Sequence, residues 1–371
     1  SKIILATDPD REGEAIAWHV KEYLNEKKLI KDKHVERVVF NEITKKAVIH
    51  GIENPRQIEP LLVDAYMARR ALDYLVGFNI SPILWTKLPG SKSAGRVQSV
   101  ALKLITEREH EIELFDPEEF WTLSVQFNDN DKNSILASIT QLNDKKIEKF
   151  SFKNKAEIDK AMEEVKSKNF NINDISSKVV NRNPSGPFTT STLQQVSSGR
   201  LGFGASRTMQ IAQKLYQGIE IDGETIGLIT YMRTDGTNLS TDAIDTFRKY
   251  IKNEFGDEYV PDNAASYSGK KAKNAQEAHE AIRPTDIMRA PDTVKKYLSP
   301  DQHKLYDLIW SRALSSQMKP AQFDRNTITI TSDDNGTICK ASGSVIKFDG
   351  FLKVMKDTKK DDDEDILPEM N

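Results

Sequence analysis

The sequence IILATDPDREGE (residues 3–14) opens with a short apolar run typical of a buried parallel strand. Carboxylates follow at every second position, Asp8, Asp10 and Glu12, and Gly13 lets the backbone tighten before a helical pattern begins. Because ligands of open α/β sheets bind at the carboxyl ends of the strands, this turn predicts a hard-cation site. Mg²⁺ is favoured, since it takes few protein carboxylates and keeps waters for phosphate oxygens. The alternative is a solvated acidic helix start, which does not explain the alternation.

A second informative stretch is GLITYMRTDG, residues 227–236, where a short apolar run leads a tyrosine into a charged loop. Tyr231 and Arg233 alternate around Met232, so in an extended backbone their side chains leave the same face. A phenol, with a pKa of about 10, becomes a nucleophile only in a polarising site. A nearby guanidinium can bind a phosphate and stabilise charge that builds up on it. The pattern predicts phosphate chemistry; the alternative is a core tyrosine beside a surface arginine.

These residues resemble a known family. DPDREGE after an apolar strand resembles the second acidic motif of a Toprim domain, and GLITYMRTDG resembles the nucleophile segment of type IA DNA topoisomerases. SAGRVQ (residues 93–98) and EAHEAIRP (residues 277–284) resemble two further motifs of that family, in the expected order. YMR, and GRVQ followed by SVA, are more similar to the bacterial topoisomerase I branch than to the topoisomerase III branch. Gly236 stands where the family often has serine.

The resemblance implies an ATP-independent enzyme that relaxes negative supercoils by cutting and rejoining one DNA strand. Tyr231 would form a 5′-phosphotyrosine link and free a 3′-hydroxyl, and Arg233 would stabilise the charged transition state. His279 would contact phosphate or assist proton transfer. The implied catalytic residues are Tyr231, Arg233, Glu12 and His279, and the implied Mg²⁺ ligands are Asp8, Asp10 and Glu12. The chain contains no P-loop pattern.

The resemblance also assigns DNA contacts to several segments. From Leu61 a strong helical period places Arg69 and Asp73 four residues apart, so an ordinary surface salt bridge is the alternative for that pair. Phe78 and Trp85 can stack on bases of a single strand, or can be core aromatics. Ser93 is expected to cap a helix whose N-terminus binds backbone phosphate; a plain capped helix is the alternative. The implied DNA-binding residues are Arg69, Arg70, Asp73, Phe78, Trp85, Ser93, Ala94, Gly95, Arg96, Val97, Gln98, Arg233, Asp235, His279 and Arg283.

The predicted fold class is multidomain α/β plus α+β. Strands are expected at residues 121–127, 134–142 and 170–180, with a helix near 156–167, and strands resume at 322–331, 337–342 and 344–354. Between them lie helices expected near 192–198, 206–217, 241–255, 275–282 and 301–318, the first with a capping box from Ser191 to Gln194 and the last with Ser299 as N-cap. In the family this is a β-rich arch that carries an inserted helical domain, together forming a toroidal core. The expected domains are 1–54 (C-terminal part of Toprim), 55–115 (helical, DNA-binding), 116–188 with 318–371 (arch) and 189–317 (helical, with the tyrosine).

Composition places few limits on function. The formal net charge is −3, so DNA binding would require positive charge concentrated in one cleft. The basic residues Arg200, Arg207 and Lys214 are as consistent with a solvated helix face as with DNA contact. One cysteine, Cys339, excludes a disulfide framework and a Cys-type zinc site in this span. No apolar run suits a membrane helix and no signal peptide is present. We expect a cytoplasmic, nucleoid-associated monomer that binds single-stranded or negatively supercoiled DNA, with no membrane and no nucleotide cofactor.

Three functional hypotheses compete with a catalytic fragment of a type IA topoisomerase. The chain starts at Ser1 on the strand of the second acidic motif, whereas in the family a strand with a glutamate precedes it and DNA-binding modules follow the core. We therefore expect an internal fragment that binds single-stranded DNA weakly and relaxes supercoils poorly. A non-catalytic binding fragment and a topoisomerase III-like decatenase are the alternatives. A Toprim primase or nuclease would share the acidic motif but has no use for YMRTD.

Overall fold

A computed structural model describes residues 2–128, 134–267 and 280–355, which form two compact units. The first comprises residues 2–115, 188–239 and 280–310, and the second the remaining described residues. Helix α10 (Pro300–Ser315) contributes to both. Among the described residues, no helix combines the length and apolar character needed to cross a membrane.

The first unit begins with a strand–helix–strand element, of which the first strand and the start of the helix were predicted. β1 (Lys2–Leu5) pairs in parallel with β2 (His34–Arg37), in a register that joins Lys2 to His34 and Leu5 to Arg37. Helix α1 (Arg11–Glu26) makes the connection, and its buried residues, Gly13, Glu14, Ala15 and Ala17, lie in its first two turns. Helix α2 (Lys45–Glu53) follows, with the Thr44 hydroxyl accepting a hydrogen bond from the Ala47 amide as its N-cap.

Two long helices come next. α3 (Pro60–Lys87) starts with a proline at its first position, where no amide donor is needed, and α4 (Gln98–Glu113) follows a loop. The expected start of α4 at Ser93 is wrong: the helix begins at Gln98 and has no side-chain cap. Long-range bonds tie the preceding loop to α3, because the Ala94 amide donates to Ser81 Oγ and Arg96 pairs with Asp73 of α3.

The helical segments that carry the tyrosine also belong to the first unit. They are α6 (Thr190–Leu201), α7 (Ala205–Gln217), the hairpin β7 (Ile219–Ile221) and β8 (Glu224–Ile226), α9 (Pro291–Val294) and a 3₁₀ turn η2 (Lys295–Tyr297). The capping box of α6 is formed by Thr189 and Thr192, not by Ser191 and Gln194. Hydroxyls occur at several adjacent positions here, so the helix starts two residues earlier than the pattern suggests.

Two further expectations near the tyrosine have different outcomes. The Ser299 hydroxyl accepts from the Gln302 amide at 3.3 Å and α10 starts at Pro300, which confirms the predicted cap. The helix expected over 275–282 is wrong where it can be seen. Residues 280–282 are not helical, and Ile282 forms a β-bridge with Phe188, while residues 275–279 lie outside the described part of the chain.

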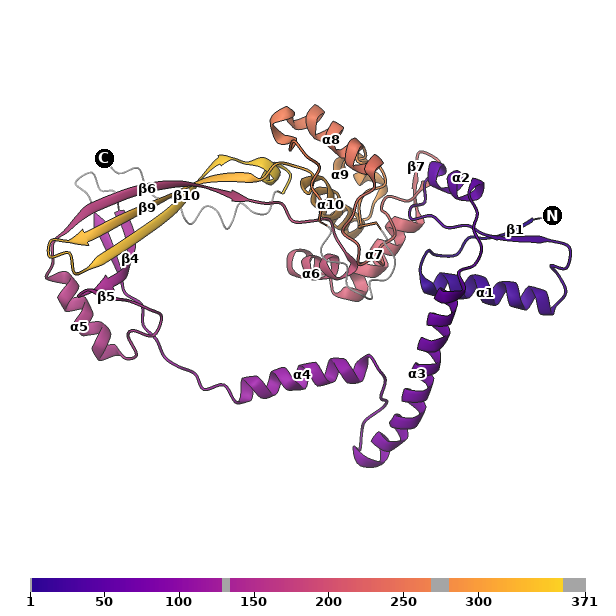
Figure 1. Cartoon of the computed structure of the whole chain (residues 1–371), viewed down its shortest axis with the longest axis horizontal. Helices are drawn as coiled ribbons and strands as arrows, with labels where there is room; N and C mark the ends of the chain where they lie inside the picture. Colours follow the sequence, from indigo (N-terminus) through magenta and orange to yellow (C-terminus); the bar gives the residue numbers. More distant parts are fainter. Residues whose placement is uncertain (1, 129–133, 268–279, 356–371) are drawn as a thin grey trace. The chain divides into compact units, whose positions relative to one another are not determined.

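The second unit is built on an antiparallel sheet in the strand order β3-β4-β10-β9-β6, with β5 beside β4. Figure 1 shows β6, β9 and β10 as long strands lying side by side. Residues 338–348 form one strand, whereas two had been expected on either side of Gly343, because β9 pairs with it without interruption at that point. The elements are β3 (Ser124–Asn128), β4 (Ser134–Leu142), β5 (Lys145–Lys146), α5 (Lys155–Lys166), β6 (Phe170–Arg182), α8 (Thr241–Phe255), η1 (Asp257–Tyr259), β9 (Ala321–Ser332), β10 (Ile338–Phe348) and η3 (Gly350–Lys353).

The core of this sheet follows from simple periodicity. Ile135, Ala137 and Ile139 alternate into the interior from β4, and Ile158 and Val165 of α5 cover the same face. The sequence therefore predicted this half of the molecule well, since alternation and helical spacing alone define it.

Candidate active site

The acidic loop between β1 and α1 is held in a single tight conformation. Asp10 is the N-cap of α1, and its Oδ1 accepts a hydrogen bond from the Gly13 amide at 2.8 Å. The Thr7 hydroxyl donates to the Gly13 carbonyl at 2.5 Å. A Cβ at Gly13 would lie 2.1 Å from the Asp8 carbonyl oxygen, so only glycine fits there. The capping bond thus fixes where the Asp10 carboxylate points.

A buried arginine supports this loop from behind. Arg37 ends β2, its side chain is fully buried, and its guanidinium donates to the carbonyls of Thr7 at 2.8 Å and Asp8 at 2.7 Å. Its Nε donates to Glu14 Oε2 at 3.1 Å. Glu14 also accepts two bonds of 2.8 Å from Arg56 and one of 2.7 Å from the Glu59 amide. The loop is therefore tied to the second strand and to the start of α3.

Sequence reasoning missed this network. Its signal was an arginine within the largely apolar stretch VERVVF (residues 35–40), where an unpaired buried charge would be costly. Burial alone raises the pKa of Glu14, but the bonds from Arg56 and the Glu59 amide and the charges of Arg37 and Arg56 outweigh it. The pKa of Glu14 consequently lies below its ordinary value.

The tyrosine segment is clamped on both sides by backbone hydrogen bonds. The amides of Gly227 and Tyr231 donate to the carbonyls of Ile43 (3.0 Å) and Asn41 (2.7 Å), and the Thr230 amide donates to the Arg283 carbonyl at 2.9 Å. Leu228 and Ile229, directly before it, are fully buried. These bonds set the tyrosine segment beside the residues that follow β2, and so beside the acidic loop.

The phenol of Tyr231 contacts the acidic loop directly. Its hydroxyl donates to Asp10 Oδ2 at 2.8 Å, and its ring packs edge-on against Tyr216 with centroids 5.3 Å apart. Only 2% of Tyr231 is exposed. Burial, followed by the hydrogen bond to Asp10, raises the pKa of Tyr231 well above its ordinary value. The phenol therefore keeps its proton at neutral pH and presents it to a carboxylate.

Arg233 completes the group. Its guanidinium lies 3.2 Å from Glu12 Oε2 and 3.7 Å from Asp10 Oδ2, and half of the side chain is exposed. Burial and the neighbouring Asp10 charge raise the pKa of Asp8, against the opposing charges of Arg233 and Arg37. A tyrosine, an arginine and a set of carboxylates thus converge from segments 221 residues apart in sequence.

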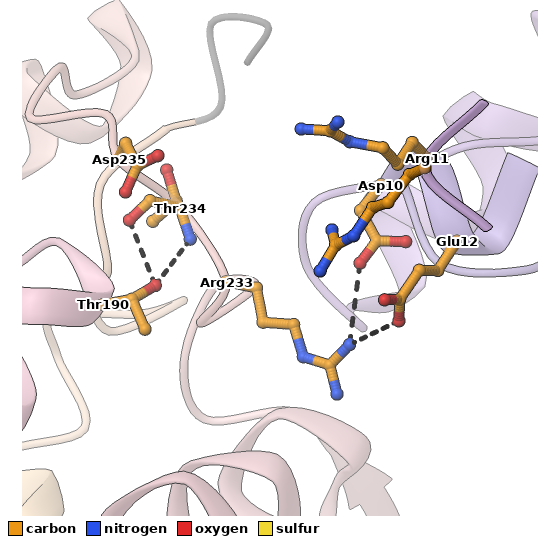
Figure 2. A pocket seen from close by; sticks show the side chains of 8 residues that line it. Asp10, Arg11, Glu12, Thr190, Arg233, Thr234 and Asp235 are labelled. Carbon is orange, nitrogen blue, oxygen red and sulfur yellow. Dashed lines mark hydrogen bonds and ion pairs between the residues drawn. The ribbon is translucent and has the colours of Figure 1, made fainter. Parts of the chain in front are cut away.

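An open pocket of about 260 Å³ lies beside these groups. Figure 2 shows Arg233 reaching across it towards Asp10 and Glu12, with Arg11 on the same side as the acidic loop. Three guanidinium groups and three carboxylates line it, next to two threonines: Arg11, Arg69, Arg233, Asp10, Glu12, Asp235, Thr190 and Thr234. Such a mixture suits a phosphate held beside a cation.

Comparison with known families agrees with this chemistry. The family described as DNA topoisomerase matches residues 57–371, and the Toprim domain family matches residues 1–43. The chain belongs to the DNA topoisomerase family. This confirms the resemblance to type IA topoisomerases that the four motifs indicated.

Individual relatives show the extent of the similarity. DNA topoisomerase 1 of Rickettsia felis is 53% identical over 364 residues, covering 98% of this chain and 47% of the relative. DNA topoisomerase 1 of Zymomonas mobilis is 49% identical over 363 residues, covering 98% and 29%. The full-length topoisomerase I structure from Thermotoga maritima matches with a TM-score of 0.78 at 40% identity, covering 95% of this chain and 54% of that one, which confirms the predicted fold class. The chain spans about half the length of most of these relatives, and less in Zymomonas.

The other topoisomerase motifs have their own arrangement within the first unit. Asp73 pairs with Arg96, at 2.5 Å, in a contact between α3 and the SAGRVQ loop, and this contact takes the place of the Arg69–Asp73 surface salt bridge that was the alternative interpretation. Arg69 instead lines the pocket. Of the motif residues, Ala94 is buried, Ser93, Gly95 and Val97 lie with it in the loop between α3 and α4, and Gln98 begins α4.

The aromatic residues of α3 are available on its surface. Phe78 is 68% exposed and stacks on Tyr74 with centroids 4.4 Å apart, so it is not a core aromatic in the described chain. Trp85 is 58% exposed, and its indole donates to the Lys92 carbonyl. Arg70 is exposed on the same helix.

The EAHEAIRP motif is only partly described. His279 lies outside the described residues. Arg283 is buried, and its guanidinium pairs with Glu280 at 2.5 Å and with Glu42 at 3.1 Å. It therefore braces the tyrosine segment against the residues after β2 in this structure, and its contact with DNA stays a prediction.

The carboxylates can be tested against the requirements of Mg²⁺. Asp8 and Asp10 lie close enough for the charge of one to raise the pKa of the other, and one or two carboxylates are what this ion takes. Glu12 is paired with Arg233. In the described parts of the chain, no group of three His, Cys, Asp or Glu side chains is arranged around a common point. The donor set fits Mg²⁺ held by Asp8 and Asp10, and Glu12 as a third ligand stays a prediction.

Proposed function

We propose that this chain is the catalytic part of an ATP-independent topoisomerase I that cuts one DNA strand through Tyr231. The observation that carries the proposal is the hydrogen bond of 2.8 Å from the Tyr231 phenol to Asp10, beside Arg233 and the pocket. The phenolic oxygen attacks phosphorus and the bond from phosphorus to the 3′ oxygen breaks. Asp10, which already accepts a hydrogen bond from the phenol, can take the phenolic proton, and the leaving oxygen takes up a proton to become the 3′-hydroxyl.

Positive charge in the pocket supports the same chemistry. Arg233, with Arg11 and Arg69 on the pocket wall, can bind the non-bridging oxygens of the attacked phosphate. Removal of one donor that stabilises such a transition state typically lowers the rate about a hundredfold. Because the phosphotyrosine link retains the energy of the broken phosphodiester bond, the freed 3′-hydroxyl can reverse the reaction without a nucleotide. The proposal gives His279 a phosphate or proton-transfer role.

The proposal includes a Mg²⁺ site at Asp8 and Asp10, with Glu12 nearby. A bound ion would supply a positive centre for phosphate oxygens during rejoining. In the chain itself, the Asp10 cap and the Arg37 bonds hold these carboxylates in place before any ligand binds. The rigid loop therefore reduces the ordering needed on binding.

DNA binding is proposed for the outlying motifs. The exposed rings of Phe78 and Trp85 can stack on unpaired bases, and Arg70 and the SAGRVQ loop can contact the backbone. We also propose the four-domain division given above, single-stranded or negatively supercoiled DNA as substrate, a monomeric state and a cytoplasmic location.

The test uses the full-length protein and a single-stranded oligonucleotide labelled at one end. With a 3′ label, the parent should give a denaturant-stable labelled protein; with a 5′ label it should release a shorter free fragment. Tyr231→Phe should abolish both products and keep DNA affinity within about threefold, because only the nucleophilic oxygen is lost. Tyr23→Phe, an exposed tyrosine of α1, is the matched control.

Each outcome is decisive. Labelled protein from the 5′-labelled strand would contradict the 5′ linkage. DNA binding without any adduct from the parent would favour a non-catalytic binding protein. Adduct formation by Tyr231→Phe would rule out this nucleophile.

A further inference from the structure

The first residue of α6 makes an unusual set of contacts with the loop after the tyrosine. The Thr190 hydroxyl lies 2.7 Å from the Met232 carbonyl, 2.8 Å from the Thr234 amide and 3.1 Å from the Thr234 carbonyl. The Thr190 amide also donates to the Thr234 carbonyl, at 2.9 Å. Two segments 42 to 44 residues apart in sequence are joined through this one side chain and its backbone.

These contacts bracket Arg233. The Met232 carbonyl and the Thr234 amide belong to the two peptide units on either side of Arg233. A hydroxyl can donate to the first and accept from the second, which a methyl group cannot do. Residues 231–239 have no helix or strand, so this segment depends on such partners for its conformation.

The anchor itself is firm. Thr189, not Thr190, is the N-cap of α6, and its capping box with Thr192 leaves the Thr190 hydroxyl for the loop. Leu193 and Ser197 of the same helix are fully buried. The bonds from Thr190 therefore connect the Arg233 backbone to a fixed element, while the Arg233 side chain remains half exposed and long.

We propose that Thr190 is a positioning residue for Arg233, which holds its backbone so that the guanidinium meets the phosphate as Tyr231 attacks. This inference rests on the proposed function and adds a residue that no motif had singled out. A side chain with several rotatable bonds reaches a given point reliably only when its backbone is fixed. A cap or a purely structural role would affect stability but not the Arg233-dependent step.

The experiment measures the rate of adduct formation in a single turnover with excess full-length enzyme. Thr190→Val, which keeps the shape and removes the hydroxyl, should slow the reaction by about ten- to a hundredfold. Thr190→Ser should restore the rate to within about threefold of the parent, since it keeps the donor and the acceptor. Ser191→Ala, on the exposed side of the same helical turn, is the matched control and should have the parent rate.

Two further measurements separate positioning from general damage. DNA affinity, measured in a Tyr231→Phe background, should be unchanged by Thr190→Val. In an Arg233→Ala background, Thr190→Val should cause no additional loss of rate, because the group that it positions is gone. If the valine variant does not fold, Thr190→Ala provides the same comparison.

The results can overturn the inference separately from the proposed function. An Arg233→Ala variant that is slow while Thr190→Val reacts at the parent rate would leave the function standing and remove the role of Thr190. Losses that multiply in the double variant, or a serine variant as slow as the valine variant, would also contradict positioning through Arg233. A parent rate for Arg233→Ala would overturn both.

Discussion

The buried charge network behind the acidic loop makes a stability prediction that does not depend on the proposed chemistry. Glu14 is the only carboxylate in the described residues that pairs with both Arg37 and Arg56, and its side chain and that of Arg37 are fully inaccessible. Glu14→Gln keeps the shape and one acceptor oxygen. Its amide nitrogen must then face either the Arg37 Nε or an Arg56 nitrogen, which opposes one donor to another.

The size of the effect follows from the burial. Removing the charge of one partner from a buried ion pair costs about 3–5 kcal/mol, because the other charge loses its compensation. We take the lower limit, about 3 kcal/mol, since Arg56 is partly exposed and can be resolvated. For a domain of 150–250 residues each kcal/mol lowers Tm by about 2–4 °C, so the expected shift is about 6–12 °C.

The effect should depend on pH in a defined direction. The pKa of Glu14 is lower in the folded protein than its ordinary value of 4.5. A group with a depressed folded pKa contributes stability above the unfolded pKa, and the contribution is lost as pH falls through the folded pKa. The difference in Tm between parent and Glu14→Gln should therefore be full at pH 7 and shrink below about pH 4.5.

The assay is thermal unfolding followed by circular dichroism at pH 7 and at a series of lower pH values. Glu26→Gln, at the exposed end of the same helix, is the control and should change stability by less than about 0.5 kcal/mol. Equal Tm values for Glu14→Gln and Glu26→Gln at pH 7 would show that the network does not stabilise the fold. A difference that grows on acidification would refute the linkage argument.

Two other substitutions test the acidic loop. Asp8→Asn combined with Asp10→Asn in the full-length protein should raise the Mg²⁺ concentration for half-maximal relaxation by about tenfold or more. Asparagine is chosen because it preserves the α1 cap. An unchanged midpoint in a relaxation titration would exclude Asp8 and Asp10 as ligands. Gly13→Ala should lower Tm because its Cβ would meet the Asp8 carbonyl at 2.1 Å. Gly199→Ala, inside α6 with open space around it, should instead stabilise the fold by about 0.5–1 kcal/mol. Unfolding curves that rank the two variants in the opposite order would contradict the geometry.

Local patterns predicted most of the regular structure. Helix α8 was expected at 241–255 and occurs at Thr241–Phe255, because Ser240 caps it and Gly256 ends it. Strand β4 was expected at 134–142 and occurs there, since buried and exposed residues alternate over 134–139. The start of α4 failed because bonds from Ala94 to Ser81 and from Arg96 to Asp73 oppose the local capping preference. Such partners lie 13 and 23 residues away, where no local rule reaches.

In the candidate site, too, some residues can be recognised from local sequence and others only from contacts with distant parts of the chain. Tyr231, Arg233 and Asp10 could be found because their residue types and spacing carry the chemistry. Arg37 and Thr190 could not, because an arginine in a strand and a threonine at a helix start have many ordinary uses. Their contacts form only once the chain brings β2 against the acidic loop and α6 beside the tyrosine segment.

A last prediction concerns the two demands on Asp10. Its Oδ1 accepts a hydrogen bond from the Gly13 amide and its Oδ2 accepts one from the Tyr231 phenol, so the phenol and any coordinated cation draw on the charge of the same carboxylate. Without the phenol, Oδ2 loses this hydrogen bond and keeps the more distant Arg233, so Tyr231→Phe should bind Mg²⁺ more tightly than the parent, by up to about tenfold if the hydrogen bond to the carboxylate contributes about 1.4 kcal/mol. Calorimetric titration of the DNA-free proteins measures this directly, with Tyr23→Phe as control. Equal affinities would show that nucleophile and cation do not compete, and tighter binding would show that both draw on the Asp10 carboxylate.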